Sequence, residues 1–218
     1  METKWSSSAW KAAEPVYEAI LKLPFITELK EGTLAAERFN FYIGQDSLYI
    51  NVYSRVLAHI ASRLADMTQV EDFLKFAGDG VYMEKALHSL YVSAGPRVMS
   101  PACLLYTSLL KAQACDDVAV EAAAILPCFW IYQAVGRHMF LTSRIEGNPY
   151  ADWIKAYSNE EFDKSNARAI AICDDLAARA SDEVRARMTD IFVEAARMEW
   201  LFWHSAYNME QWPVEIRP

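Results

Sequence analysis

Two acidic side chains and one thiol stand within apolar stripes at helical spacing, where a protein core is expected. Asp46 lies among residues that recur every three or four positions: Phe39, Tyr42, Ile43, Tyr49, Ile50 and Tyr53. Glu199 is placed in the same way among Phe192, Ala195, Ala196, Phe202, Trp203 and Ala206, and Cys128 among Ala124, Ile125, Tyr132 and Val135. A carboxyl group kept from water can exchange protons near neutral pH, and a thiolate is a nucleophile. Two such acids and a thiol, each on a separate helix, favour acid–base and nucleophilic chemistry over a purely structural role.

A structural interpretation of the two acids stays open. Burying a carboxylate without a partner is costly, so Asp46 and Glu199 would pair with Arg, Tyr or Trp groups and serve only to hold helices together. The neighbour of Cys128 favours chemistry instead. Pro127 lies inside a strongly helical stretch, where it removes an amide donor and frees the carbonyl group of Ala123. We therefore expect the thiol to meet the unusual polarity that a thiolate needs.

The other candidate ligands predict no metal site. The cysteines have no CxxC spacing, and three are expected to be ordinary packing residues: Cys103, Cys115 and Cys173. A di-iron bundle needs two Glu-x-x-His pairs, whereas Glu84 and His88 form a single pair one turn apart. The isolated histidines are more typical of ordinary positions than of haem ligands: His59, His138 and His204. The absence of a glycine-rich phosphate loop argues against a nucleotide enzyme.

Helical periodicity runs almost from end to end and positions these residues. The predicted helices are Trp5–Leu23, a short one near Ile26–Lys30, Leu34 to about Leu64, Thr68 to Gly95-Pro96, one from Ser100-Pro101, Asp116-Asp117 to about Thr142, one from Ser158, and Ser181 to about Asn208. Thr33 is the expected N-cap of the long helix that begins at Leu34. Thr68–Glu71 and Ser158–Glu161 have the pattern of capping boxes. Glu146–Pro149 is expected to be a loop. No stretch alternates with period two, so we predict one all-α domain over residues 1–218, with seven or eight helices around a pocket.

Composition limits the classes of partner. The 218 residues carry 21 basic and 29 acidic side chains, a net charge of −8, and the sequence pI is near 5.1. That balance argues against nucleic acid or an anionic membrane as the main partner. The polar start METKWSSS does not resemble a signal peptide, and no window has about 18 uninterrupted apolar residues. We expect a soluble cytoplasmic protein with reduced thiols.

Several motifs resemble the TenA family, also called thiaminase II. They keep the family's order between about Pro24 and Tyr207 and comprise Pro24-Phe25, Gly32-Thr33-Leu34, Phe39, Tyr42–Tyr49, Glu84 with Leu87-His88, Tyr106-Thr107-Ser108, Leu126–Tyr132 with Gly136, Trp153-Ile154 with Tyr157, and Glu199 with Phe202-Trp203. Each block alone is weak. The combination of QD-x-x-Y, LPC-x-W-x-Y and E-x-x-FW is highly specific.

The resemblance implies a haem-oxygenase-like helical bundle, usually a homotetramer, that needs no metal or organic cofactor. Members release hydroxymethylpyrimidine from aminomethyl-pyrimidine, and many also cleave thiamin. By resemblance, Cys128 is the nucleophile and Glu199 the acid/base group. Asp46 binds the amino edge of the ring, and four tyrosines line or position it: Tyr49, Tyr106, Tyr132 and Tyr157.

Two departures from the family pattern leave alternatives open. Leu109 stands where many relatives carry histidine, and Met198 stands where tyrosine is common, and either change could reshape the pocket. A non-catalytic or regulatory binder of a pyrimidine or thiamin derivative is therefore the alternative to an enzyme. A haem or di-iron protein of the same architecture is a third hypothesis, disfavoured because the ligand pairs are missing.

Overall fold

The computed structural model describes residues 4–91 and 98–214, and only the backbone for residues 83–91. All regular structure in these ranges is helical, which confirms the all-α prediction. The α-helices are α1 Trp5–Ile20, α2 Pro24–Glu31, α3 Ala36–Arg63, α4 Met67–Tyr91, α5 Pro101–Ala112, α6 Val118–Thr142, α7 Ala151–Ala156, α8 Glu160–Arg179 and α9 Asp182–Tyr207, with a 3-10 turn at Gln113–Cys115. The seven or eight helices predicted become nine in the described part, and the additional helix is α7.

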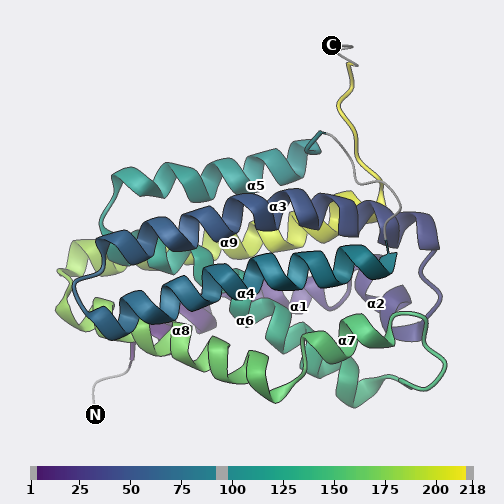
Figure 1. Ribbon diagram of the computed structural model, residues 1–218, viewed down its shortest axis with the longest axis horizontal. Coiled ribbons are helices and arrows are strands. Elements are labelled where there is room, and N and C mark those ends of the chain that lie inside the picture. Colours follow the sequence, from purple (N-terminus) through teal and green to yellow (C-terminus); the bar gives the residue numbers. More distant parts are fainter. Residues whose placement is uncertain (1–3, 92–97, 215–218) are drawn as a thin grey trace.

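The long helices run roughly side by side and pack in pairs (Figure 1). Helix α3 lies along α4, α6 along α9 and α8, and α1 along α9, while α5 covers one edge of the bundle against α3 and α9. Helix α6 is long and apolar enough to cross a membrane by length and composition alone, but 72% of its most apolar window is buried inside the protein. It is the central helix of this core, and it carries Cys128.

Local signals fixed some helix starts and misplaced others. The side chains of Ser100, Asp117 and Ser181 accept hydrogen bonds from backbone amides of the first turns of α5, α6 and α9, as predicted. The prediction for Thr33 was wrong, because α3 begins after Ala35 and the Thr33 hydroxyl donates to the carbonyl oxygen of Glu28.

Both capping boxes were displaced by one or two residues. Asp66, not Thr68, caps α4, since its carboxylate accepts from the amides of Thr68 and Gln69. Asn159, not Ser158, caps α8 by accepting from the amide of Phe162. In both places an Asp or Asn side chain, which caps helices at least as well as a hydroxyl, accepts the amide hydrogen bonds instead. The predicted end at Gly95-Pro96 lies outside the described residues.

The predicted loop at Glu146–Pro149 is confirmed, and it positions α7. The Asn148 side-chain amide donates to the carbonyl oxygens of Leu29 and Lys30 at 3.1 Å each. Gly32 ends α2 with φ +73°, and a Cβ atom there would come within 3.2 Å of Pro149. The left-handed conformation and the close approach both require glycine. This junction ties α7 to α2 and so places Trp153 and Tyr157 in the core.

Candidate functional site

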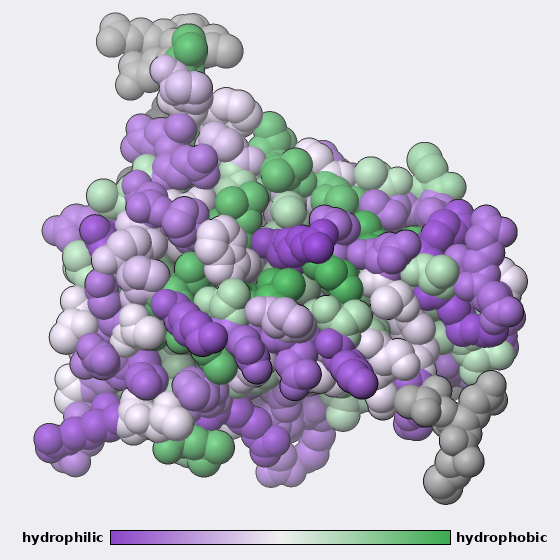
Figure 2. Space-filling view, turned by 180° about the vertical axis from the view of Figure 1, so that it is seen from behind, coloured by the Kyte–Doolittle hydropathy of each residue, from purple (hydrophilic) through white to green (hydrophobic). Residues whose placement is uncertain are grey.

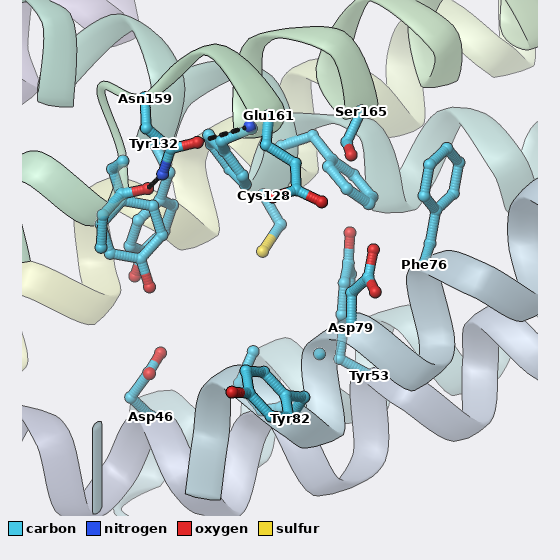
Figure 3. Close-up of a pocket in the computed structure, with 16 residues that line it drawn as sticks. Asp46, Tyr53, Phe76, Asp79, Tyr82, Cys128, Tyr132, Asn159, Glu161 and Ser165 are labelled. Carbon is cyan, nitrogen blue, oxygen red and sulfur yellow. Dashed lines mark hydrogen bonds between the residues drawn. The ribbon is translucent and has the colours of Figure 1, made fainter. Parts of the chain in front are cut away.

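A cavity of about 370 Å³ lies between α3, α4, α6 and the chain from α7 to α8. Figure 3 shows its walls, with polar side chains from several helices pointing inward. The lining residues are Asp46, Ile50, Tyr53, Phe76, Asp79, Gly80, Tyr82, Cys128, Phe129, Tyr132, Ala156, Tyr157, Asn159, Glu161, Phe162 and Ser165. A space of this size accommodates a small heterocyclic ligand.

The thiol of Cys128 points into the middle of this cavity (Figure 3). Burial raises the pKa of Cys128 well above its ordinary value, and Glu199 and Asp46 raise it further because a thiolate would face two negative charges. The hydroxyls of Tyr49 and Tyr53 face the thiol and partly lower its pKa. The expected polarity is therefore present, but the thiol is held protonated at neutral pH.

Glu199 lies behind the cavity wall on α9 and is only 1% exposed. Its Oε1 accepts a hydrogen bond of 2.7 Å from the hydroxyl of Tyr106 on α5. Burial raises the pKa of Glu199 to about 8, the Tyr106 hydroxyl lowers it, and the nearby Asp46 raises it. A carboxyl group with such a pKa is available both as an acid and as a base near neutral pH.

Asp46 on α3 is 7% exposed, and its carboxylate points into the cavity opposite Cys128 (Figure 3). Its charge reaches several groups of the site, since it raises the pKa of Glu199 and also those of Tyr132 and Tyr157. The carboxylate is thus placed to meet the polar edge of a bound ligand while it acts on the proton equilibrium of Glu199.

The four predicted tyrosines divide into two pairs. Tyr132 and Tyr157 form part of the cavity wall, with ring centroids 4.9 Å apart. Tyr49 and Tyr106 pack behind the wall with ring centroids 4.8 Å apart. The Tyr49 hydroxyl is buried and, besides facing the thiol, has no partner of hydrogen-bond geometry within the described structure. The first pair therefore forms part of the cavity surface, whereas Tyr106 contacts Glu199 and Tyr49 faces Cys128.

Gly136 on α6 allows the chain that carries Tyr157 to approach. A Cβ atom at this position would lie 2.6 Å from the carbonyl oxygen of Tyr157 and 2.8 Å from its Cβ atom. Any larger residue must displace that backbone, since real Cβ contacts are longer. The glycine thus brings the Tyr157 ring beside Tyr132.

All seven predicted site residues are therefore brought together around one cavity. Sequence reasoning missed most of the outer wall, in particular Asp79, Tyr82, Asn159, Glu161 and Ser165. Asp79 follows Lys75 at the spacing of a surface ion pair, and Glu161 stands in a helix start, so neither pattern marks a pocket. Leu109 and Met198 are half-buried against the core and are not part of the cavity wall.

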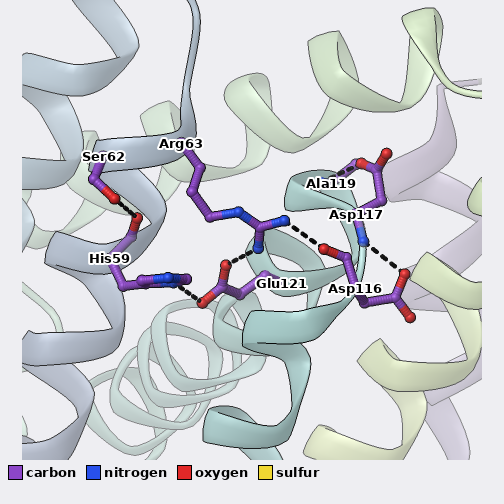
Figure 4. A network of polar contacts seen from close by, with 7 residues as sticks. All are labelled: His59, Ser62, Arg63, Asp116, Asp117, Ala119 and Glu121. Carbon is purple, nitrogen blue, oxygen red and sulfur yellow. Dashed lines mark hydrogen bonds and ion pairs between the residues drawn. The ribbon is translucent and has the colours of Figure 1, made fainter.

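Another buried carboxylate, outside the cavity, lies two turns before Cys128 on α6. Glu121 is 1% exposed, and its oxygens contact Nδ1 of His59 at 2.7 Å and Nη1 of Arg63 at 2.5 Å. The Arg63 guanidinium also donates to the carbonyl oxygen of Asp116 (Figure 4). This network joins α3 to the start of α6, outside the cavity.

Metal ligands do not gather in the described side chains. No group of three or more His, Cys, Asp or Glu residues that could hold a metal ion occurs among them. The Glu84 and His88 side chains lie outside what the structure describes.

Residues 10–209 match the TENA/THI-4/PQQC family. The chain belongs to this family. It is 31% identical over 219 residues to the aminopyrimidine aminohydrolase of Bacillus subtilis, covering 96% of this chain and 92% of that protein. It is 37% identical over 173 residues to the thiamine biosynthesis multifunctional protein ThiED of Corynebacterium efficiens, covering 77% of this chain and 23% of that protein. The chain thus spans about a quarter of the length of that relative.

Solved structures of the TENA/THI-4/PQQC family have the same fold. A TenA homologue from Pyrococcus horikoshii superposes with a TM-score of 0.81 at 25% identity, covering 94% of this chain and 99% of that one. The predicted haem-oxygenase-like bundle is confirmed by this likeness.

Proposed function

We propose that this protein is a thiamin-salvage hydrolase that releases hydroxymethylpyrimidine from aminomethyl-pyrimidine, with thiamin as a second substrate. The observation that carries the proposal is one cavity in which the Cys128 thiol and the Asp46 carboxylate face each other, with the buried Glu199 close enough to raise the pKa of the thiol. Relatives named for aminopyrimidine hydrolysis and thiamine biosynthesis support the substrate class.

In this proposal the aminopyrimidine ring lies between Cys128 and Asp46, with Tyr132 and Tyr157 against its faces. Asp46 accepts hydrogen bonds from the ring amino group, and the aromatic walls hold the ring flat. Cys128 is the nucleophile, and Glu199 exchanges protons with the ring nitrogen.

The raised pKa values define how the proton moves. The thiol and Glu199 both enter the reaction protonated at neutral pH. Sulfur bonds to a ring carbon while Glu199 gives its proton to the ring nitrogen and receives the proton of the thiol. The protonated amine then leaves from the methylene group as ammonia, because it already carries its third hydrogen, and an exocyclic double bond forms. Water adds to this bond and releases one proton to solvent. The C–S bond breaks as aromaticity is restored, while the ring nitrogen returns its proton to Glu199 and Glu199 gives the proton that it took from the thiol back to the sulfur. One difficult displacement is thereby divided into easier steps.

A turnover assay with aminomethyl-pyrimidine and with thiamin tests the proposal, with hydroxymethylpyrimidine measured by chromatography. Cys128→Ser should keep the fold and bind product but retain less than about a tenth of the wild-type kcat, because a serine hydroxyl is a far weaker nucleophile. Cys115→Ser is the matched control, since that thiol is exposed and outside the cavity.

Full activity in Cys128→Ser would instead make water the attacking group. Product binding without turnover of either substrate by the wild type would favour the alternative, a non-catalytic or regulatory binder.

The proposed assembly is a homotetramer in the cytoplasm that binds neither nucleic acid nor membrane. Leu104 and Leu105 on α5 are 40% and 52% exposed. Figure 2 shows hydrophobic side chains in the upper half of the face opposite that of Figure 1, at the edge where α5 runs. Light scattering should give four times the 24.8 kDa of the chain. A monomeric mass would contradict this assembly.

A further inference from the structure

The outer part of the cavity carries two acids that the proposed reaction does not use. Asp79 comes from α4 and Glu161 from the first turn of α8, and both carboxylates point inward on the side of the thiol away from Tyr132 (Figure 3). The Asp79 side chain is 49% exposed and Tyr82 beside it is 73% exposed. These residues therefore form the mouth of the cavity, while Asp46 lies deeper.

The described cavity wall contains no Lys, Arg or His to balance these acids. Lys75, outside the wall, contacts Asp79 at 2.5 Å, and Glu161 also raises the pKa of Lys75. One lysine therefore offsets one of the two mouth charges. The neighbouring acids of α8 point elsewhere, since Glu160 pairs with Lys164 and Asp163 with Arg137.

The cavity wall is also partly apolar, because Phe76, Phe129 and Phe162 line it. Apolar walls reduce the screening of nearby charges and focus the field of a cleft. A cation that enters this part of the cavity is therefore stabilised, and an anion is disfavoured.

We propose that Asp79 and Glu161 are specificity-determining residues that select substrates with a positively charged leaving group. This inference rests on the proposed function. It applies to a protonated aminomethyl group and, more strongly, to the quaternary thiazolium ring of thiamin, whose positive charge is permanent. A phosphate carried on the leaving group is rejected for the same reason.

The test compares ligands of different charge on four proteins: wild type, Asp79→Asn, Glu161→Gln and the double variant. We expect each single change to raise the KM for thiamin about 2- to 5-fold, the range typical of a partly exposed ion pair. The inhibition constant of hydroxymethylpyrimidine, which is neutral, should stay within about 1.5-fold. Salt at about 0.5 M screens charges that are partly exposed to solvent. It should therefore reduce the preference of the wild type for thiamin over the neutral hydroxymethylpyrimidine.

Glu160→Gln is the matched control for Glu161→Gln. Both residues stand in the first turn of α8 and act on its helix dipole, but the Glu160 side chain is 83% exposed and outside the wall. This control should leave the KM for thiamin unchanged. Asp79→Glu, which keeps the charge, should retain the wild-type KM and so separates charge from folding.

The outcomes separate the two proposals. If the wild-type protein turns over neither aminomethyl-pyrimidine nor thiamin, both the proposed function and this inference are wrong. If the wild type is active but the variants change the KM for thiamin and the inhibition constant of hydroxymethylpyrimidine equally, selection by charge is wrong and the proposed function stands. The same holds if no variant changes the KM for thiamin.

Discussion

Two glutamates of equal burial have different surroundings in this protein. Glu199 and Glu121 are each 1% exposed. Glu121 contacts the Arg63 guanidinium and the His59 imidazole (Figure 4), whereas the bonded partner of Glu199 is the neutral hydroxyl of Tyr106. A cation stabilises the carboxylate form, but a phenol only partly replaces water.

The comparison teaches that burial alone does not make an acid/base catalyst. Burial raises the pKa of Glu199 to about 8, and no cation is among the hydrogen-bond partners described for it to oppose that shift. Glu121, with two basic partners, joins α3 to the start of α6 and lies outside the cavity that holds the thiol. The proton that the proposed chemistry needs is therefore available at Glu199.

Glu199→Gln has the largest expected effect, because it keeps the shape and removes proton transfer. A general acid or base contributes about 10²–10⁴-fold, so we expect kcat to fall within that range while product affinity changes little. The wild-type rate should decline above pH 8 as Glu199 loses its proton, and this limb should vanish in the variant. A pH–rate profile measures both. Intact turnover per folded molecule would make Glu199 a structural residue.

The same variant tests how the stability of the protein depends on pH. Because the folded pKa is raised from 4.5 to about 8, the folded state holds a proton that the unfolded state has released. The free energy of unfolding of the wild type should therefore decrease as pH rises from about 4.5 to about 8. Glu199→Gln should lose this dependence and melt at a higher temperature than wild type at pH 9.

Asp46→Asn tests whether Asp46, a third buried carboxylate, binds the ligand and raises the pKa of Glu199. If Asp46 accepts hydrogen bonds from the ring amino group, its loss should weaken binding of hydroxymethylpyrimidine by ~10–150-fold, the effect of losing a charged partner. Removal of its negative charge should also move the alkaline limb of the rate profile to lower pH. Calorimetry gives the Kd, and an unchanged Kd would remove Asp46 from ligand binding.

The sequence was sufficient for the inner site and insufficient for its mouth. Asp46, Cys128 and Glu199 interrupt apolar stripes at helical spacing, a signal that depends on one helix at a time. Asp79 and Glu161 lie in sequence patterns typical of solvent-exposed helix positions. Only the packing of α4 beside α8 brings both side chains to one cavity. Glu121 lies within a run of alanines, where nothing in the pattern indicates its pairing with Arg63.

Glu121→Gln should act on stability and not on turnover. It removes the charge opposite Arg63, whose side chain is 26% exposed, so water compensates in part and we expect a cost of about 1–3 kcal/mol. For a chain of this size that lowers the Tm by about 2–4 °C per kcal/mol. Glu194→Gln, at an exposed pair with Arg197, is the control and should change stability by less than about 0.5 kcal/mol. Loss of kcat per folded molecule in Glu121→Gln would break the comparison.

Tyr106→Phe has the smallest expected effect on rate, but it tests directly whether the alkaline limb of the rate profile belongs to Glu199. The Tyr106 hydroxyl lowers the pKa of Glu199 by donating to its carboxylate, so the variant should move the alkaline limb of the rate profile to higher pH. The rate on the plateau below that limb should change by less than about tenfold, because the acid itself remains. Tyr207→Phe is the matched control, since it removes a hydroxyl that donates to Glu28 at 2.6 Å, far from the cavity wall. That control should leave the limb in place. If the limb stays fixed in Tyr106→Phe as well, it belongs to a group other than Glu199, and the contrast between the two glutamates does not explain catalysis.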